Sequence, residues 1–148
     1  MKKPYILLIS CGLPVLILAA IYLYEQIDHQ QTVQTVYAAQ HQIEDQKRMV
    51  RENITQYVTA ERNTYQYSSL GGIYNLKISV SNKSDYLIDN IKVKVTYIKA
   101  NGGIWKEKMI DFNLVEGHKM ITQSVPDENR GVSVQYEIVS IHSSVLGI

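Results

Sequence analysis

The stretch NLKISVSNKSDYLIDNIKVKVTYIKANGG, residues 75–103, decides the fold because its apolar side chains recur at every second position. Leu76, Ile78 and Val80 alternate with polar residues, and the same alternation returns from Ile91 to Tyr97. A period of two is typical of a β-strand with one buried face. The polar interval between the two runs and the closing Asn-Gly-Gly are turn chemistry. The stretch therefore predicts two strands, each followed by a turn.

Turn signals, and a last alternating run of Val132, Val134, Tyr136 and Ile138, extend this pattern to a whole domain. Three further strands are expected, at residues 104–114, 119–125 and 132–138, with turn signals between them. Five short strands without an intervening helical pattern predict an antiparallel β-sandwich of the immunoglobulin or fibronectin type III kind, over residues 73–148. The largest buried side chains are expected to be Tyr97, Trp105, Phe112 and Tyr136.

Three features of this domain resemble known families. They are the Val-x-Asn-x-Ser run from Val80 to Ser84, the Val-x-Val-x-Tyr strand from Val93 to Tyr97, and the Gly102-Gly103 turn. The chain resembles small extracytoplasmic β-sandwich domains of bacterial, Bacteroidetes-type membrane proteins, and it is similar to FxLYD-like domains. The resemblance implies a non-catalytic envelope module without a shared active site.

The N-terminal segment, residues 1–24, has the features of a membrane anchor. Pro4 to Tyr24 is an uninterrupted run without a charged residue, which as a helix is long enough for the ~30 Å hydrocarbon core. Lys2 and Lys3 precede the run and acidic residues follow it. The positive-inside rule then places the N-terminus in the cytoplasm and the remaining chain outside the bacterial cytoplasmic (inner) membrane, in the periplasm or beyond.

Two other export signals overlap this segment. Leu8-Ile9-Ser10-Cys11 fits a lipobox, and Ala19-Ala20 offers small residues for ordinary signal cleavage. Few apolar residues precede Cys11, however, and the apolar run continues to Tyr24. These features favour an uncleaved, single-pass anchor. Because Cys11 is the only cysteine, the chain forms no intramolecular disulfide and has no cysteine-based zinc site.

Residues 25–64 are expected to form a polar helical stalk, followed by a short linker at residues 65–72. Glycine and proline are absent until Gly71, which favours helix. Sparse apolar residues follow a heptad spacing, and polar residues such as Gln40 and Lys47 interrupt the same seam. The stalk is either a solvated spacer or a homo-oligomerisation helix, whose stripe would then comprise Val36, Ile43, Val50, Ile54 and Tyr57.

No set of residues in the sequence predicts catalysis or a cofactor. There is no nucleophile–base motif, phosphate-binding loop or metal-ligand spacing, so we expect no enzyme activity and no cofactor or metal. The acidic loops at Asp85–Asp89 and at 127–129 are predicted to lie at opposite ends of the sandwich. A net charge of +1, without a basic segment, also argues against binding to nucleic acid.

Two surface features are candidates for binding. Lys77, Lys92 and Lys94 are predicted to form a basic stripe on an outward face, although strand lysines also serve to discourage edge-to-edge aggregation. Trp105 follows the Gly102-Gly103 turn and is a candidate stacking platform for a sugar.

These observations predict a membrane-anchored envelope protein that presents a small sandwich as a protein-binding or assembly module. Its expected partners are the membrane, through the single span, and another envelope protein. The alternative is a ligand-binding or carbohydrate-binding sensor domain, which would use Trp105.

Overall fold

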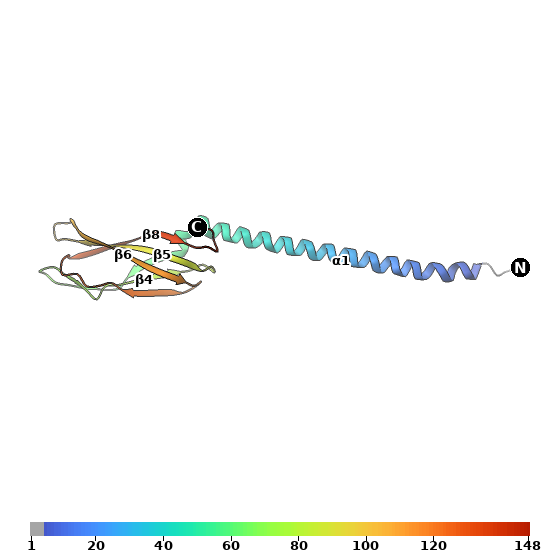
Figure 1. Ribbon diagram of the computed structural model, residues 1–148, viewed down its shortest axis with the longest axis horizontal. Coiled ribbons are helices and arrows are strands. Elements are labelled where there is room, and N and C mark those ends of the chain that lie inside the picture. The colour runs from blue at the N-terminus through green and yellow to red at the C-terminus, as the bar shows by residue number, and fades with distance from the viewer. Residues whose placement is uncertain (1–4) are drawn as a thin grey trace. The chain divides into compact units, whose positions relative to one another are not determined.

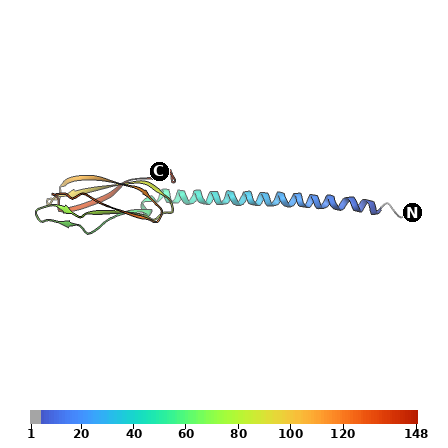
Figure 2. The ribbon, with the colours of Figure 1, turned by 60° about the horizontal axis from the view of Figure 1, so that its bottom comes forward.

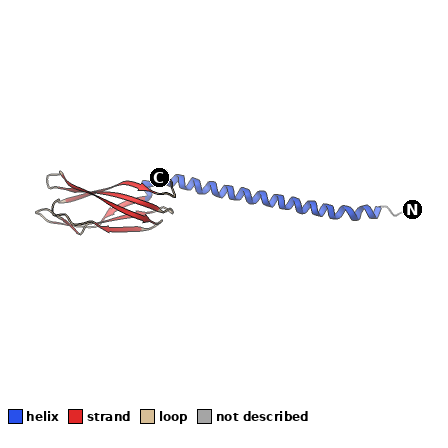
Figure 3. Cartoon of the chain, in the orientation of Figure 1, coloured by secondary structure: helices blue, strands red, loops and turns tan. Residues whose placement is uncertain are grey.

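A computed structural model describes the backbone of residues 5–148 and the side chains of residues 17–26 and 30–148. The chain divides into two compact units, residues 1–46 and 47–148. The first contains most of helix α1, Tyr5–Glu52, which Figure 3 draws as one continuous helix. The second contains the end of α1, the short helix α2, Ile54–Tyr57, and a β-sandwich.

Helix α1 exposes its described apolar side chains in the region of the predicted anchor. Ile17, Leu18 and Leu23 are each more than half exposed. In the described part of the chain, no helix is both long and apolar enough to cross a membrane. The lipobox at Leu8–Cys11, and the part of the predicted span before Ile17, lie outside the residues whose side chains are described.

The predicted stalk is too long at its C-terminal end, because α1 ends at Glu52 and not at residue 64. Asn53 ends the helix: its Nδ2 donates to the Met49 carbonyl at 2.9 Å, which satisfies one of the free carbonyls of the last turn. The expected stalk residues 58–62 instead form strand β1, Val58–Arg62, which pairs antiparallel with β4, Lys77–Asn82. Pairing with a distant strand overrides the local helical tendency here.

The predicted linker also contains regular structure. Strand β2, Gln66–Tyr67, pairs antiparallel with β3, Ile73–Tyr74. Gly71 and Gly72 connect them with positive φ angles of 96° and 123°, a conformation that glycine adopts without steric cost.

The β-sandwich prediction is confirmed, with two antiparallel three-stranded sheets in the described chain. One has the order β1-β4-β7 and the other the order β6-β5-β8. Figures 1 and 2 show the strands as two layers. The strands of the domain occur where the sequence predicted them: β5 is Ile88–Ile98, β6 Ile104–Val115, β7 Met120–Ser124 and β8 Ser133–His142.

The core lies between the two sheets. Tyr97 and Phe112 are fully buried, as predicted, whereas Trp105 and Tyr136 are only partly buried and pack at its margin. The remaining buried apolar side chains are mostly β-branched residues, which pack well on a pleated surface, and β4 and β5 contribute several of them from their inner faces.

The Val-x-Asn-x-Ser motif has a structural role in this core. Asn82 is fully buried, and its Nδ2 donates to the carbonyls of Tyr86 at 2.7 Å and Val115 at 3.0 Å. Its Oδ1 accepts hydrogen bonds from both the backbone N–H and the hydroxyl of Ser84. The motif therefore fixes the connection between β4 and β5 and ties it to the end of β6.

Candidate functional site

A groove of about 570 Å³ runs between β1 and β8, at one flank of the sandwich. Each of these strands is the edge of its sheet, and the two come close to each other across the layers. The apolar part of the lining comes from both sheets and from the adjoining α2 and C-terminal residues: Ile54, Val58, Ala60, Tyr136, Ile138, Val139, Ile141 and Ile148. Most of these side chains are only partly buried, so part of the core faces solvent here.

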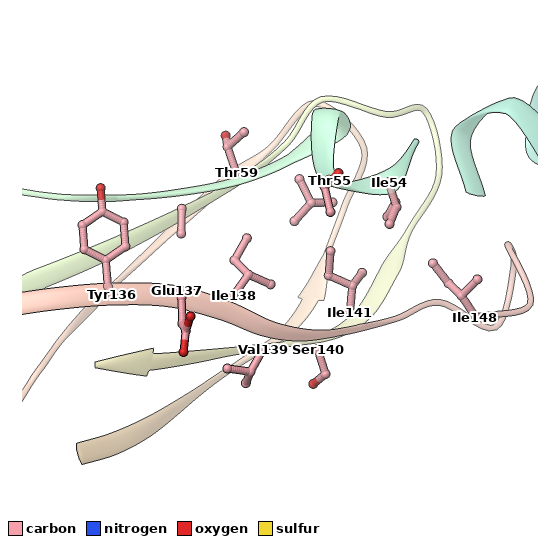
Figure 4. Close-up of a pocket in the computed structure, with 12 residues that line it drawn as sticks. Ile54, Thr55, Thr59, Tyr136, Glu137, Ile138, Val139, Ser140, Ile141 and Ile148 are labelled. Carbon is pink, nitrogen blue, oxygen red and sulfur yellow. The ribbon is translucent and has the colours of Figure 1, made fainter. Parts of the chain in front are cut away.

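The direction of the β8 side chains explains the groove. In Figure 4, Ile138 and Ile141 project toward the segment that carries Ile54 and Thr55, and Tyr136 projects from the same side of β8 toward the strand that carries Thr59. Ile138 and Ile141 are three residues apart, which in a regular strand would place them on opposite faces. A register shift in the β5–β8 ladder pairs Ile138 with Val93 and Ser140 with Lys92. Val139 is therefore the extra residue of a β-bulge, and it keeps both isoleucines on the inner face.

The backbone of β8 is capped at both ends of the groove. The Val134 N–H donates to the hydroxyl of Tyr65 at 3.2 Å. At the other end, the Ser143 N–H donates to the Ile148 carbonyl at 2.9 Å, and the Ile148 N–H donates back to Ser143 at 3.1 Å.

Between these capped ends, the edge of β8 has no neighbouring strand in the described chain. In an antiparallel strand, alternate residues direct their backbone groups to the same side. Tyr136 and Ile138 share the alternation of Val134, so their N–H and C=O groups point away from β5. The middle of the edge is thus available for hydrogen bonding.

The margin of the groove is close to neutral. Glu137 is the only charged residue in the lining, and Lys94 on β5 forms an ion pair with it at 2.5 Å. The hydrogen bond to Glu137 raises the pKa of Lys94 above its ordinary value. The remaining polar lining residues are the hydroxyl side chains of Thr55, Thr59 and Ser140.

The predicted oligomerisation stripe is divided by the structure. Val36 and Ile43 are exposed on α1, whereas Val50 is buried in the core of the second unit. Ile54 and Tyr57 pack partly against that same core. The five residues therefore do not form one partner-facing stripe, because the helix ends and its last apolar residues join the sandwich.

The predicted basic stripe is absent from the described chain, because its lysines belong to different sheets. Lys77 lies on β4, whereas Lys92 and Lys94 lie on β5 in the other layer. Lys92 pairs with Asp111 at 3.4 Å and Lys94 pairs with Glu137. Alternation correctly predicted that these side chains point outward, but it does not reveal which strands share a sheet.

Trp105 is partly buried, and cations lie against its ring. The guanidinium carbon of Arg130 is 4.7 Å from the ring centroid, and Lys99 Nζ is 5.7 Å from it. The indole Nε1 is buried and has no hydrogen-bond partner in the described chain. The ring is therefore not an open stacking platform.

The acidic loop residues are held by partners within the chain. Asp85 contacts His118 at 2.7 Å, and Asp127 accepts a hydrogen bond from the Asn75 N–H at 3.0 Å. Asp89 accepts from the Ser144 N–H at 2.6 Å, and this backbone hydrogen bond lowers the pKa of Asp89. Among the residues that the structure describes, no group of three or more His, Cys, Asp or Glu side chains could hold a metal ion.

The groove itself was missed by sequence reasoning, although β8 carries a signal for it. In GVSVQYEIVSI the alternation fails after Ile138, where Val139 follows directly and the next apolar residue is Ile141. One extra residue inside an alternating run is typical of a β-bulge. The absence of a strand beside β8 cannot be recognised from local pattern.

Comparison with known proteins identifies no family for this chain. No protein-family model matches it, and no curated protein matches its sequence. A solved structure that is similar is a DUF1425 family member from Shewanella sp. pv-4, with 14% sequence identity and a TM-score of 0.42. The alignment covers 56% of this chain and 77% of that one. A match at this level carries no information about function.

Proposed function

We propose that the protein is a membrane-anchored module of the bacterial envelope that binds another envelope protein through its β-sandwich. The groove between β1 and β8 carries this proposal, because it joins partly exposed core side chains to an unpaired strand edge. Apolar surface rimmed by polar residues is typical of interaction sites, and here Thr55, Thr59 and Ser140 supply the polar rim. The proposal includes no catalytic role.

We assign the sandwich to the immunoglobulin or fibronectin type III kind. The sheet orders β1-β4-β7 and β6-β5-β8 support this, since the chain crosses between layers after β4, after β6 and after β7. The Val-x-Asn-x-Ser motif is the feature that links this chain to the proposed extracytoplasmic, FxLYD-like relatives. The hydrogen bond between its buried Asn82 and Ser84 side chains gives the motif a structural role. Domains of this architecture present loops, faces and edges to partners.

The anchor is proposed from residues 4–24, with the N-terminus in the cytoplasm and the sandwich outside. Residues 17–24 are all apolar or aromatic and all exposed, Ile17, Leu18 and Leu23 among them. This part of the helix therefore has no polar face. A helix that is apolar all round is stable when apolar surroundings cover it, as lipid does. Mass spectrometry of the membrane-extracted protein tests this assignment, because an intact N-terminus supports it and a lipidated Cys11 contradicts it.

In-cell photo-crosslinking of the full-length protein tests the binding function. The photoreactive residue is placed at Thr59 or Val139, on either side of the groove, and at exposed Met109 on β6 as a matched position on the same sandwich. We expect an adduct with one envelope protein. Recovery of monomer alone from all three positions contradicts the proposed function.

The alternative of a sugar-binding or ligand-binding sensor has weaker support. It depends on a free aromatic face at Trp105, and Arg130 already lies against that ring. Self-association through the helix also has limited support, since only Val36 and Ile43 of the predicted stripe are exposed. A coiled-coil seam ordinarily extends over at least three heptads.

A further inference from the structure

We propose that the free edge of β8 accepts an extended strand from another protein, which pairs antiparallel to β8 and inserts apolar side chains into the groove. This inference rests on the proposed protein-binding function and specifies the chemistry of the partner. The partner segment is uncharged, adopts the β conformation and carries apolar side chains at alternate positions.

Backbone geometry supplies the first argument. Tyr136 and Ile138 direct N–H and C=O groups toward the open side of β8, where no strand lies in the described chain. Only an extended polypeptide presents complementary donors and acceptors at the two-residue repeat of a strand. A small apolar ligand would fill the groove but leave these backbone groups unpaired.

The C-terminal residues indicate the direction of the partner strand. Ser143 and Ile148 exchange two backbone hydrogen bonds, which is the pattern of an antiparallel pair, and Ile148 lines the groove. This side of the β8 edge thus already accepts antiparallel pairing at its end. A partner strand in line with Ile148 would cover the stretch from Ile141 back to Tyr136.

Side chains supply the second argument. Tyr136, Ile138 and Ile141 point into the groove from β8, as Figure 4 shows. Val58 and Ala60 line it from β1. A strand between the two edges would insert every second side chain among these residues. Because Lys94 neutralises Glu137, the groove gives no electrostatic preference for a charged segment.

A second copy of this chain fits the groove less well than a foreign strand does. Direct β8-to-β8 pairing would extend the sheet, but Tyr136, Ile138 and Ile141 of each copy would still point into their own groove. Two half-open grooves would then lie side by side, and neither would be filled. The occupant is therefore a strand whose side chains are free to enter.

The test uses the full-length protein in detergent micelles and a designed probe peptide. The probe is a capped peptide of about nine residues in which valine and threonine alternate, and the control has the same composition with the valines placed together. Residue-resolved amide exchange should show fast exchange at Tyr136 and Ile138 without the probe. The alternating peptide should protect both amides saturably, and the control peptide should not.

Two lysine substitutions on β8, one inside the groove and one outside it, provide a matched pair. Ile138→Lys places a charge in the groove and should weaken probe binding by about tenfold or more. Gln135→Lys places the same charge on an exposed side chain of the same strand that is outside the groove lining, and should change affinity by less than about twofold. Ile138→Thr keeps the β-branched shape and should weaken binding as well, so it replaces the lysine variant if that variant does not fold.

Several results would overturn the inference. They are the absence of protection at Tyr136 and Ile138 at millimolar probe, equal effects of the two lysine variants, and protection that appears without probe as protein concentration rises. The last result would identify a second copy as the occupant. Crosslinks to an envelope protein from Met109 but not from Thr59 or Val139 would leave the binding function standing and reject the groove as its site.

Discussion

The two flanks of the sandwich are each made of one edge strand from each sheet, yet one flank is closed and the other is open. On the β6–β7 flank, Gln123 Nε2 donates to the Asp111 carbonyl at 2.9 Å. Glu128, just beyond β7, binds the ammonium groups of Lys106 and Lys108 on β6. On the β1–β8 flank, Tyr65 just beyond β1 accepts a hydrogen bond from the Val134 N–H at one end of β8, but no described side chain bridges the middle of the flank, and a groove remains there.

The two flanks differ in whether side chains block their unpaired sheet edges. An unpaired edge is a template for pairing with foreign strands, and proteins ordinarily block it with side chains, bulges or charges. The closed flank follows that rule fully through Gln123 and Glu128. The open flank has a bulge at Val139, but its neighbouring backbone groups stay free. The open flank is thus the one suited to a partner.

The largest expected effect comes from the closed side of the molecule. Phe112 is the inward-facing, fully buried aromatic residue of β6. Phe112→Ala should lower the free energy of unfolding by about 3–5 kcal/mol, because it removes buried apolar surface and leaves a cavity. Chemical denaturation of the purified chain measures this value. A loss below about 1 kcal/mol would show that β6 is as loosely packed as β8.

Asn82 should give the next largest effect, since it closes the end of β6. Asn82→Ala removes the donor to the carbonyls of Tyr86 and Val115 and leaves buried groups unsatisfied. We expect a loss of about 2–3 kcal/mol in the free energy of unfolding. Ser81→Ala, one residue away on the outer face of the same strand, is the matched control and should change stability by less than about 0.5 kcal/mol.

The open flank should be more tolerant of the same kind of truncation. Ile138 faces inward from edge strand β8, as Phe112 does from β6, but it is only partly buried. Ile138→Ala should cost about 1 kcal/mol, because water already reaches the groove and a closed cavity does not form. Thermal and chemical denaturation measure it beside Phe112→Ala. Equal losses in the two variants would remove the distinction between the flanks.

The two flanks also differ in how far sequence reasoning could reach them. The sequence predicted β6 and β7 because turn residues bound them, at Gly102-Gly103, at Glu116-Gly117 and in the loop after Val125. Strand β1 was read as helix, since Val58 and Ala60 lie in a segment without glycine or proline and their pairing partner on β4 is distant. An open flank depends on which strands have no neighbour, and that property belongs to the whole topology. The groove therefore lay beyond local pattern.

The smallest expected effect is a pH dependence of the closed flank. The ammonium groups of Lys106 and then Lys108 hold the pKa of Glu128 below its ordinary value of 4.5. A carboxyl whose pKa is lower in the folded chain stabilises the fold fully above its unfolded pKa, and this stabilisation is lost as the pH falls through the lowered value. The stability of the wild-type chain should therefore fall more steeply below pH 4.5 than that of Glu128→Gln. Denaturant titrations of both proteins from neutral to acidic pH measure the difference.

Glu137→Gln at the open flank is the matched control. Its partner Lys94 has a raised pKa and stays charged throughout this range, and both side chains are solvated. The loss of stability at acidic pH should therefore change less in this variant than in Glu128→Gln. Equal changes from the two substitutions would show that the ion pairs at Glu128 do not close their flank more firmly than surface pairs do.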